Sequence, residues 1–307
     1  MKLSIVQTDV PQTAERVEAA LQTLSEAYPF LETELLARTA FGRPIYAVTI
    51  GTGQRRVLYS AAHHANEWLT ATVLLKFIED YAEALQNDAQ LGGVSARELY
   101  QNATIHLVPL VNPDGVDLVT GAIEPGTEQY ERAREFAGFY PNIPFPDGWK
   151  ANLNGVDLNL QYPAGWLRAR EIKFSQGFTR PGPRDYVGRF PLCQIEPQAL
   201  YDLTERIDPA IVIAWHSQGQ VIYWQYGGIE VPGARELAER FAQVSGYTLE
   251  DTPYNSSFAG YKDWFIQAFR RPGFTIEVGI GTNPLPVSQF DDIYRASLPI
   301  LLEGAVG

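Results

Sequence analysis

The sequence predicts an α/β sandwich built around a mixed β-sheet. Short apolar runs typical of buried strands recur along the chain, at residues 56–62, 104–111, 211–215 and 274–280. Segments with apolar residues at helical spacing separate these runs, near residues 67–85, 196–207, 233–245 and 288–303. Buried strands that alternate with helices indicate helices packed on the faces of one sheet.

The chain is expected to be one domain over residues 1–307. Its 307 residues would suffice for two domains of ordinary size, but no linker, repeat or low-complexity tract divides them. Two long stretches, 121–151 and 161–195, interrupt the regular pattern and are rich in proline, glycine, aromatic and charged residues. Long loops inside a compact domain are commonly functional, so we expect both to be ordered walls of a cleft.

The N-terminal part predicts a helix followed by a hairpin. Residues 11–28 carry apolar positions at helical spacing, and Pro11 is suited to a first turn. Residues 33–39 and 44–50 flank the turn-forming sequence Phe-Gly-Arg-Pro, which is typical of two paired strands.

Composition excludes some partners. The net charge is −12 and the isoelectric point about 4.8, whereas nucleic acids and anionic membranes reward a basic face. Cys193 is the only cysteine, which rules out an intrachain disulfide and is compatible with a reducing compartment. The sequence shows no secretory signal and no run of transmembrane length, so we expect a cytoplasmic protein, with action at the cell wall or outside the cell as the alternative.

Two adjacent histidines, His63 and His64, precede Glu67 at the end of an apolar run. Histidine and glutamate are natural zinc ligands, and either histidine could converge with Glu67 on one ion if the chain turns there. Strand alternation places the two rings on opposite sides, so only one should be a ligand, and the His-x-x-Glu spacing favours His64. The alternative interpretation of the short motif is a capped or paired start of a helix.

A third ligand and a base must come from elsewhere in the chain. His216 ends an apolar run, at the edge of the sheet where α/β proteins gather their sites. His106 lies inside an apolar strand and is expected to be a hydrogen-bonded core residue. Glu277 has apolar neighbours on both sides, which is costly for a carboxylate unless it is paired or functional. We expect it to be either a buried ion-pair partner or the base that takes a proton from metal-bound water.

Six motifs follow one another in a characteristic order: His64-x-x-Glu67, Asn112-Pro-Asp-Gly, Gly155-Val-Asp-Leu-Asn, His216-Ser, Gly260-x-x-Asp-Trp and Glu277 in a late strand. This order, spread over residues 40–285, resembles the zinc carboxypeptidase family of metallopeptidases. The resemblance implies a single three-layer α/β/α domain with a mixed, mostly parallel, eight-stranded sheet. It also implies that one zinc ion is bound by His64, Glu67 and His216. By the same resemblance, Glu277 is the catalytic base and Asp157 orients the first ligand histidine.

The chain departs from the carboxypeptidase pattern at two positions. Leu160 stands where carboxypeptidases of this family have the arginine that, with the residue matching Asn159, binds a free C-terminal carboxylate. Leucine cannot form a charge-assisted bond to a carboxylate. Lys150 stands where the family has an arginine that stabilises the oxyanion, and we assign it that role, with a solvated lysine as the alternative.

The stretch around Trp149-Lys-Ala-Asn and Gly155-Val-Asp-Leu-Asn, with Pro181-Gly-Pro-Arg-Asp-Tyr, resembles the γ-D-glutamyl-diaminopimelate peptidases. These bacterial enzymes hydrolyse the bond between γ-D-glutamate and meso-diaminopimelate in peptidoglycan stem peptides. Arg184 and Lys262 are candidates for binding substrate carboxylates, and a solvated surface cation is the alternative for each. Tyr254 lies near the position of the family's mobile tyrosine, with Tyr261 as the competing candidate.

The resulting prediction is a zinc-dependent peptidase acting on peptidoglycan-derived peptides. Two alternatives stay open. One is an ordinary metallocarboxypeptidase that uses another cation in place of the arginine missing at Leu160. The other is an inactive zinc-bearing protein that binds acidic cell-wall peptides, against which the intact ligand set and Glu277 count.

Overall fold

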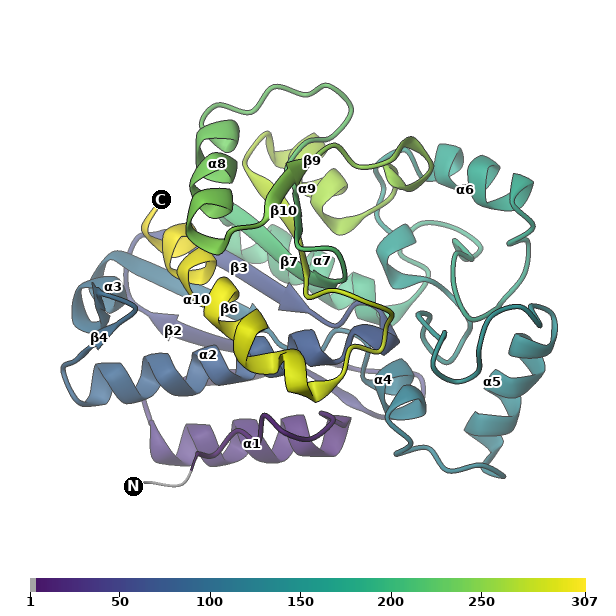
Figure 1. The fold of residues 1–307 in the computed structure, drawn as a ribbon, viewed down its shortest axis with the longest axis horizontal. Helices are drawn as coiled ribbons and strands as arrows, with labels where there is room; N and C mark the ends of the chain where they lie inside the picture. The colour runs from purple at the N-terminus through teal and green to yellow at the C-terminus, as the bar shows by residue number, and fades with distance from the viewer. Residues whose placement is uncertain (1–3) are drawn as a thin grey trace.

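The computed structural model describes residues 4–307, so residues 1–3 of the N-terminal segment considered for a signal lie outside the described part (Figure 1). One sheet of eight strands runs through the molecule in the order β1-β2-β6-β3-β7-β10-β8-β9. Its strands are β1 (Glu32–Arg38), β2 (Pro44–Gly51), β3 (Arg55–Ala61), β6 (Ala103–Val108), β7 (Ile211–Ser217), β8 (Val221–Tyr223), β9 (Thr248–Glu250) and β10 (Gly273–Val278). The predicted mixed, mostly parallel sheet in a single α/β domain is confirmed.

The centre of the sheet is parallel and its edges are mixed. Strands β6, β3, β7 and β10 pair in parallel, β1 and β2 form the predicted antiparallel hairpin, and β8 pairs antiparallel to β10. Because parallel strands share a direction, the carboxyl ends of the four central strands meet at one edge of the sheet. The functional residues predicted from the sequence cluster at this edge.

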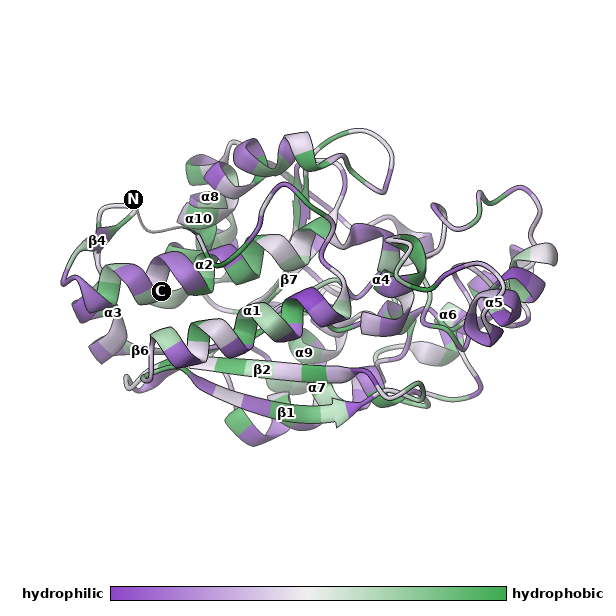
Figure 2. Ribbon diagram, turned by 90° about the horizontal axis from the view of Figure 1, so that it is seen from below, coloured by the Kyte–Doolittle hydropathy of each residue, from purple (hydrophilic) through white to green (hydrophobic). Residues whose placement is uncertain are grey.

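Helices cover both faces of the sheet. One face packs against α1 (Ala14–Ala27), α2 (Leu69–Gln86), α3 (Ala96–Asn102), α8 (Ala234–Ser245) and α10 (Phe290–Val306), and the other against α7 (Ile195–Ile207) and α9 (Tyr261–Phe269). Along β3, Val57 and Tyr59 face the first layer while Leu58 faces the second, as the two-residue period of a strand requires. Helix α1 alternates hydrophilic and hydrophobic residues because only one of its sides is buried (Figure 2).

Three more helices lie beyond the carboxyl ends of the strands, toward the teal end of the molecule in Figure 1. They are α4 (Pro113–Val119), α5 (Glu128–Gly138) and α6 (Trp166–Ser175). The remaining elements are the small hairpin of β4 (Gln90–Leu91) and β5 (Val94–Ser95) and the short turns η1 (Ala65–Glu67), η2 (Leu158–Leu160), η3 (Tyr254–Ser256) and η4 (Val287–Gln289). Among residues 4–307, no helix is both long and apolar enough to cross a membrane.

Several predicted boundaries shift in the structure. Helix α1 begins at Ala14, where the Thr13 side chain accepts a hydrogen bond from the Arg16 backbone, so Pro11 lies before the helix and not in its first turn. The stretches 121–151 and 161–195 are less irregular than expected, because each contains a helix, α5 and α6 respectively.

The central strands predict a clear contrast in stability. Leu58→Ala on β3 removes a side chain with 0% exposure and should lower the free energy of unfolding by about 2–5 kcal/mol, because the cavity cannot fully collapse. Leu35→Ala on the edge strand β1, where the leucine is 44% exposed, should cost about 0.5 kcal/mol or less. Urea denaturation of both variants measures the difference, and equal losses would contradict the assigned burial.

Candidate active site

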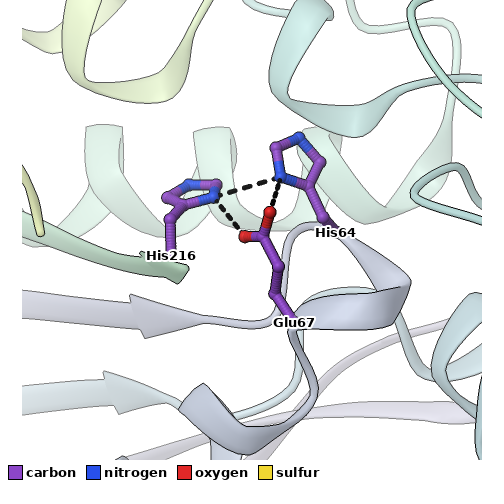
Figure 3. Close-up of side chains that lie close together, drawn as sticks. All are labelled: His64, Glu67 and His216. Carbon is purple, nitrogen blue, oxygen red and sulfur yellow. Dashed lines mark hydrogen bonds and ion pairs between the residues drawn. The ribbon is translucent and has the colours of Figure 1, made fainter. Parts of the chain in front are cut away.

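His64, Glu67 and His216 converge at the edge of the sheet (Figure 3). His64 precedes the turn η1, Glu67 ends it, and His216 lies near the end of β7. One oxygen of Glu67 lies 2.9 Å from Nδ1 of His64 and the other lies 2.8 Å from Nδ1 of His216. The two Nδ1 atoms are 3.2 Å apart. The three residues predicted as ligands therefore present their donor atoms to one point.

The carboxylates of Glu67 and Asp157 make this point attractive to a cation. Nε2 of His64 lies 3.2 Å from Asp157, and its Nδ1 faces Glu67 and Nδ1 of His216. Burial alone would lower the pKa of His64, but Glu67 and Asp157 raise it to about 9, so a metal ion that binds this ring would release a proton from Nδ1. Two imidazole nitrogens and one carboxylate around a common point match a catalytic zinc site with a free position for water. The residues present thus fit the zinc ion implied by the sequence.

Asp157 occupies the position expected for the residue that orients His64. One of its oxygens contacts His64, and the other accepts a hydrogen bond of 3.1 Å from the backbone nitrogen of Asp185. Burial alone would raise the pKa of the Asp157 carboxyl, but His64 and these hydrogen bonds hold it well below its usual range. An ionised carboxylate at Nε2 fixes the tautomer and the ring orientation of a ligand histidine.

His63 lies outside the ligand cluster. Its ring stacks on that of His216 with centroids 5.4 Å apart, and its Nε2 lies 3.4 Å from the hydroxyl of Tyr162. Strand alternation does not explain why the His63 and His64 rings lie apart, because β3 ends at Ala61, before both residues. Ala62 has a φ of 52°, and this turn sends the two adjacent side chains in different directions.

Glu277 and Lys150, the candidates for base and oxyanion partner, lie beside this cluster. Glu277 on β10 is the register partner of His216 on β7, which places both residues side by side at the sheet edge. Burial raises the pKa of Glu277 to about 8, and the neighbouring Glu67 adds to this shift. Nζ of Lys150 donates to Glu67 at 2.9 Å, a contact the sequence did not predict. Burial alone would lower the pKa of Lys150, but the charges of Glu67 and Glu277 and the hydrogen bond to Glu67 together raise it.

Two hollows meet at this centre. The inner cavity, of about 230 Å³, is lined by residues including Asn159, Leu160, Lys173, Lys262 and Thr275. The outer cleft, of about 780 Å³, is lined by the 142–148 segment, Ser217, Gln218 and the 281–284 segment. Four residues line both hollows, namely Lys150, Arg184, Tyr223 and Glu277. Tyr223 was missed in the sequence, because an aromatic residue in a short strand reads as core.

The residues predicted to bind substrate lie in different settings. Asn159 lines the inner cavity, and its Oδ1 accepts a 3.0 Å hydrogen bond from the backbone of Tyr261. Arg184 lies at the junction of both hollows and donates to Asp185 at 2.7 Å. Lys262 is buried and donates to both Asp263 and the Gln225 carbonyl at 2.6 Å.

The two tyrosines considered for the mobile position do not present a hydroxyl to the cavity. Tyr254 is 60% exposed, accepts a hydrogen bond of 3.1 Å from Arg168, and is not among the residues that line either hollow. Tyr261 lines the inner cavity, but its hydroxyl contacts Thr204 in the interior at 2.8 Å. His106, expected as a core residue, contacts Thr49 at 2.9 Å and lies outside the cluster.

Asparagine side chains fix the segment that carries Lys150 and Asp157. The Asn112 amide caps α4 and donates to three backbone carbonyls, those of His63, Lys150 and Ala151. The Asn152 amide donates to Glu196 at 3.0 Å, at the start of α7. The Asn-Pro-Asp-Gly motif therefore joins the strand β6 to the turn that bears the ligands.

The carboxyl of Glu196 predicts a pH-dependent stability. Burial raises its pKa to about 7, above the value near 4.3 of an unfolded chain, so the protonated form stabilises the fold. This contribution is complete below about pH 4.3 and is lost as the pH rises through 7. Glu196→Gln should therefore match the wild type at pH 4–5 and exceed its free energy of unfolding at pH 8.

Urea denaturation at the two pH values measures this difference. Glu205→Gln, an exposed change on the same helix, serves as the control and should alter stability by less than about 0.5 kcal/mol at both. A Glu196→Gln variant that is less stable than the wild type at pH 8 would contradict the assignment.

The adjacent histidines give a matched test of the ligand set. His64→Gln removes a donor and should weaken zinc binding by more than the roughly 10–100-fold typical of losing an outer hydrogen-bond partner. His63→Gln leaves all three donors in place and should retain one zinc per chain. Elemental analysis after dialysis distinguishes them, and zinc retained by the first variant or lost by the second would remove His64 from the ligand set.

Comparisons with known proteins agree with this site. The model of the zinc carboxypeptidase family matches residues 17–299. The chain is 45% identical over 284 residues to γ-D-glutamyl-L-diamino acid endopeptidase 1 of Lysinibacillus sphaericus, covering 92% of this chain and 69% of the relative. It is 31% identical over 142 residues to murein peptide amidase A of Escherichia coli strain K12, covering 45% and 43%.

The fold is also that of a solved carboxypeptidase. Carboxypeptidase A from Helicoverpa armigera has a TM-score of 0.71 at 18% identity, and the match covers 98% of this chain and 75% of that one. The resemblance inferred from the six ordered motifs is thus confirmed, and with it the expectation of a zinc-dependent peptidase. The chain belongs to the zinc carboxypeptidase family.

Proposed function

We propose that this peptidase hydrolyses the amide bond between a γ-D-glutamyl residue and a diamino acid in peptidoglycan-derived peptides. The observation that carries the proposal is that the candidate metal site adjoins a cavity lined by charged residues of both signs, with Leu160 at the carboxylate-binding position. The relative that is 45% identical over most of the chain is a γ-D-glutamyl-L-diamino acid endopeptidase, which supports the same bond.

The two hollows suit the two sides of such a substrate. The diamino acid would enter the inner cavity, where Asn159 and Lys262 face it. The glutamyl residue would lie in the outer cleft, and Arg184, at the junction, would bind its α-carboxylate. Tyr254 would contact the substrate only after its hydrogen bond with Arg168 is broken.

The residues of this chain divide the chemistry between them. Zinc, when bound, polarises the scissile carbonyl and lowers the pKa of a water molecule to roughly 7. Glu277 would accept the proton of that water and pass it to the leaving amine. Burial raises the pKa of this carboxyl, which favours the second step, and the charge of a bound cation would favour the ionised form that the first step needs. Lys150, whose ammonium donates to Glu67, would turn toward the carbonyl oxygen of the substrate and stabilise the negative charge that develops there.

Leu160 makes ordinary carboxypeptidase action the less favoured reading. The leucine side chain packs against Trp166 and Ala169 and offers no donor to a free C-terminal carboxylate. A substrate whose C-terminus is blocked should therefore be accepted.

Incubation of the zinc-loaded protein with L-Ala-γ-D-Glu-meso-diaminopimelate tests the proposal. Mass spectrometry should detect L-Ala-D-Glu and free diaminopimelate, a chelator should abolish both products, and amidation of the diaminopimelate α-carboxyl should be tolerated. Glu277→Gln should retain zinc and lose about 10²–10⁴-fold in rate, the usual contribution of a general base.

Two outcomes would overturn the assignment. Release of C-terminal residues from ordinary α-linked peptides, without cleavage of the γ-linked substrate, would establish carboxypeptidase action instead. Binding of the γ-linked peptide without any product would indicate an inactive binding protein.

A further inference from the structure

Lysine is concentrated at one place in this chain. The sequence contains five lysines, at positions 2, 76, 150, 173 and 262. Three of them, Lys150, Lys173 and Lys262, line the inner cavity together with Arg184. Four carboxylates, Asp157, Asp185, Asp263 and Glu277, line the same cavity, so its affinity for an anionic group depends on which cation has unused hydrogen-bond donors.

Lys173 reaches the cavity from α6. Trp166 and Ala169 of this helix pack against Leu160, and Lys173 lies one turn beyond Ala169, on the same side of the helix. Its side chain is only 8% exposed, and Nζ lies 2.6 Å from Oδ1 of Asp185. The leucine that replaces the carboxypeptidase arginine thus also helps to hold the helix that brings a different cation to the same cavity.

Around Lys173, the cavity has more unused hydrogen-bond donors than unused acceptors. Asp185 has both oxygens engaged, one by Lys173 and the other by Arg184 at 2.7 Å. A lysine ammonium has three N–H groups, and within residues 4–307 Asp185 is the one ion-pair partner of Lys173. The spare capacity is therefore in donors, and a buried ammonium with spare donors favours an anionic acceptor.

The position of Lys173 selects which carboxylate it can meet. Lys173 lines only the inner cavity, whereas Arg184 lines both the inner cavity and the outer cleft. A chain of contacts, His64 to Asp157 to Asp185 to Lys173, separates it from the metal site by two residues. Lys173 can therefore contact only the part of the substrate that enters the inner cavity.

We propose that Lys173 is a specificity-determining residue that binds the distal carboxylate of the diamino acid, an inference that rests on the proposed function. Lys262 is less suited to this task, because two acceptors at 2.6 Å already engage its ammonium. Diaminopimelate carries this carboxylate and lysine, which otherwise has the same carbon chain up to its ε-carbon, lacks it. Lys173 would then discriminate between these two diamino acids.

Lys173→Met, assayed on two substrates, tests the inference. For L-Ala-γ-D-Glu-meso-diaminopimelate, kcat/KM should fall roughly 10- to 100-fold, as expected for the loss of a hydrogen bond to a charged group. For L-Ala-γ-D-Glu-L-Lys it should stay within about threefold of the wild type, because no bond to a carboxylate is lost. Lys173→Arg should retain most of the preference for diaminopimelate.

The controls separate the possible failures. Lys76→Met removes another helix lysine held in ion pairs, far from the cavity lining, and should leave both rates unchanged. Zinc content and thermal melting show whether Lys173→Met is folded. Equal losses on both substrates, or none on either, would overturn the role of Lys173 while the proposed function stands. A wild-type protein that cleaves neither substrate would overturn the proposed function and this inference together.

Discussion

The rest of the site depends on the buried carboxylate of Glu67. An isolated carboxylate at this depth would be strongly destabilising. Here its two oxygens face His64, His216, Lys150 and the backbone nitrogen of Ser217 at 3.3 Å. These partners hold the pKa of Glu67 well below its usual range despite burial, which alone would raise it. One side chain thus joins the turn η1, the end of β7 and the segment before η2.

The parallel centre of the sheet supplies the remaining geometry. Because β7 and β10 pair in register, a ligand histidine and the expected base stand on neighbouring strands without help from any loop. Loops then set the substrate range around this rigid edge. The segments that contain α5 and α6 wall the two hollows, as expected for the 121–151 and 161–195 stretches. Strands therefore position His216 and Glu277, whereas turns and loops supply the other candidate site residues and the cavity walls.

Strands that are buried on both faces could be predicted from the sequence, whereas features whose burial depends on packing against distant segments could not. The runs that form β3, β6, β7 and β10 are mostly apolar, so they were recognisable as central strands. Helix α5 buries only Ala133 and Ala137, which leaves too weak a pattern to detect. Lys173 lies on a polar helix and is expected from the sequence to be solvated, because its burial follows from the packing of α6 and from its ion pair with Asp185. The three candidate ligands could be identified because their spacing and order are characteristic, whereas the cavity beside them is formed by segments far apart in sequence.

Asp157 has a consequence that extends past the orientation of one ring. One of its oxygens faces the ligand His64, and the other holds the turn at Asp185, which pairs with Lys173. Asp157 therefore helps to hold both the candidate metal ligand His64 and the part of the cavity lining formed by Asp185 and Lys173. By thermodynamic linkage, a substrate that orders the turn at Asp185 would also strengthen metal binding, and a bound metal would order the turn to the same extent. Substrate and metal would then each favour the binding of the other.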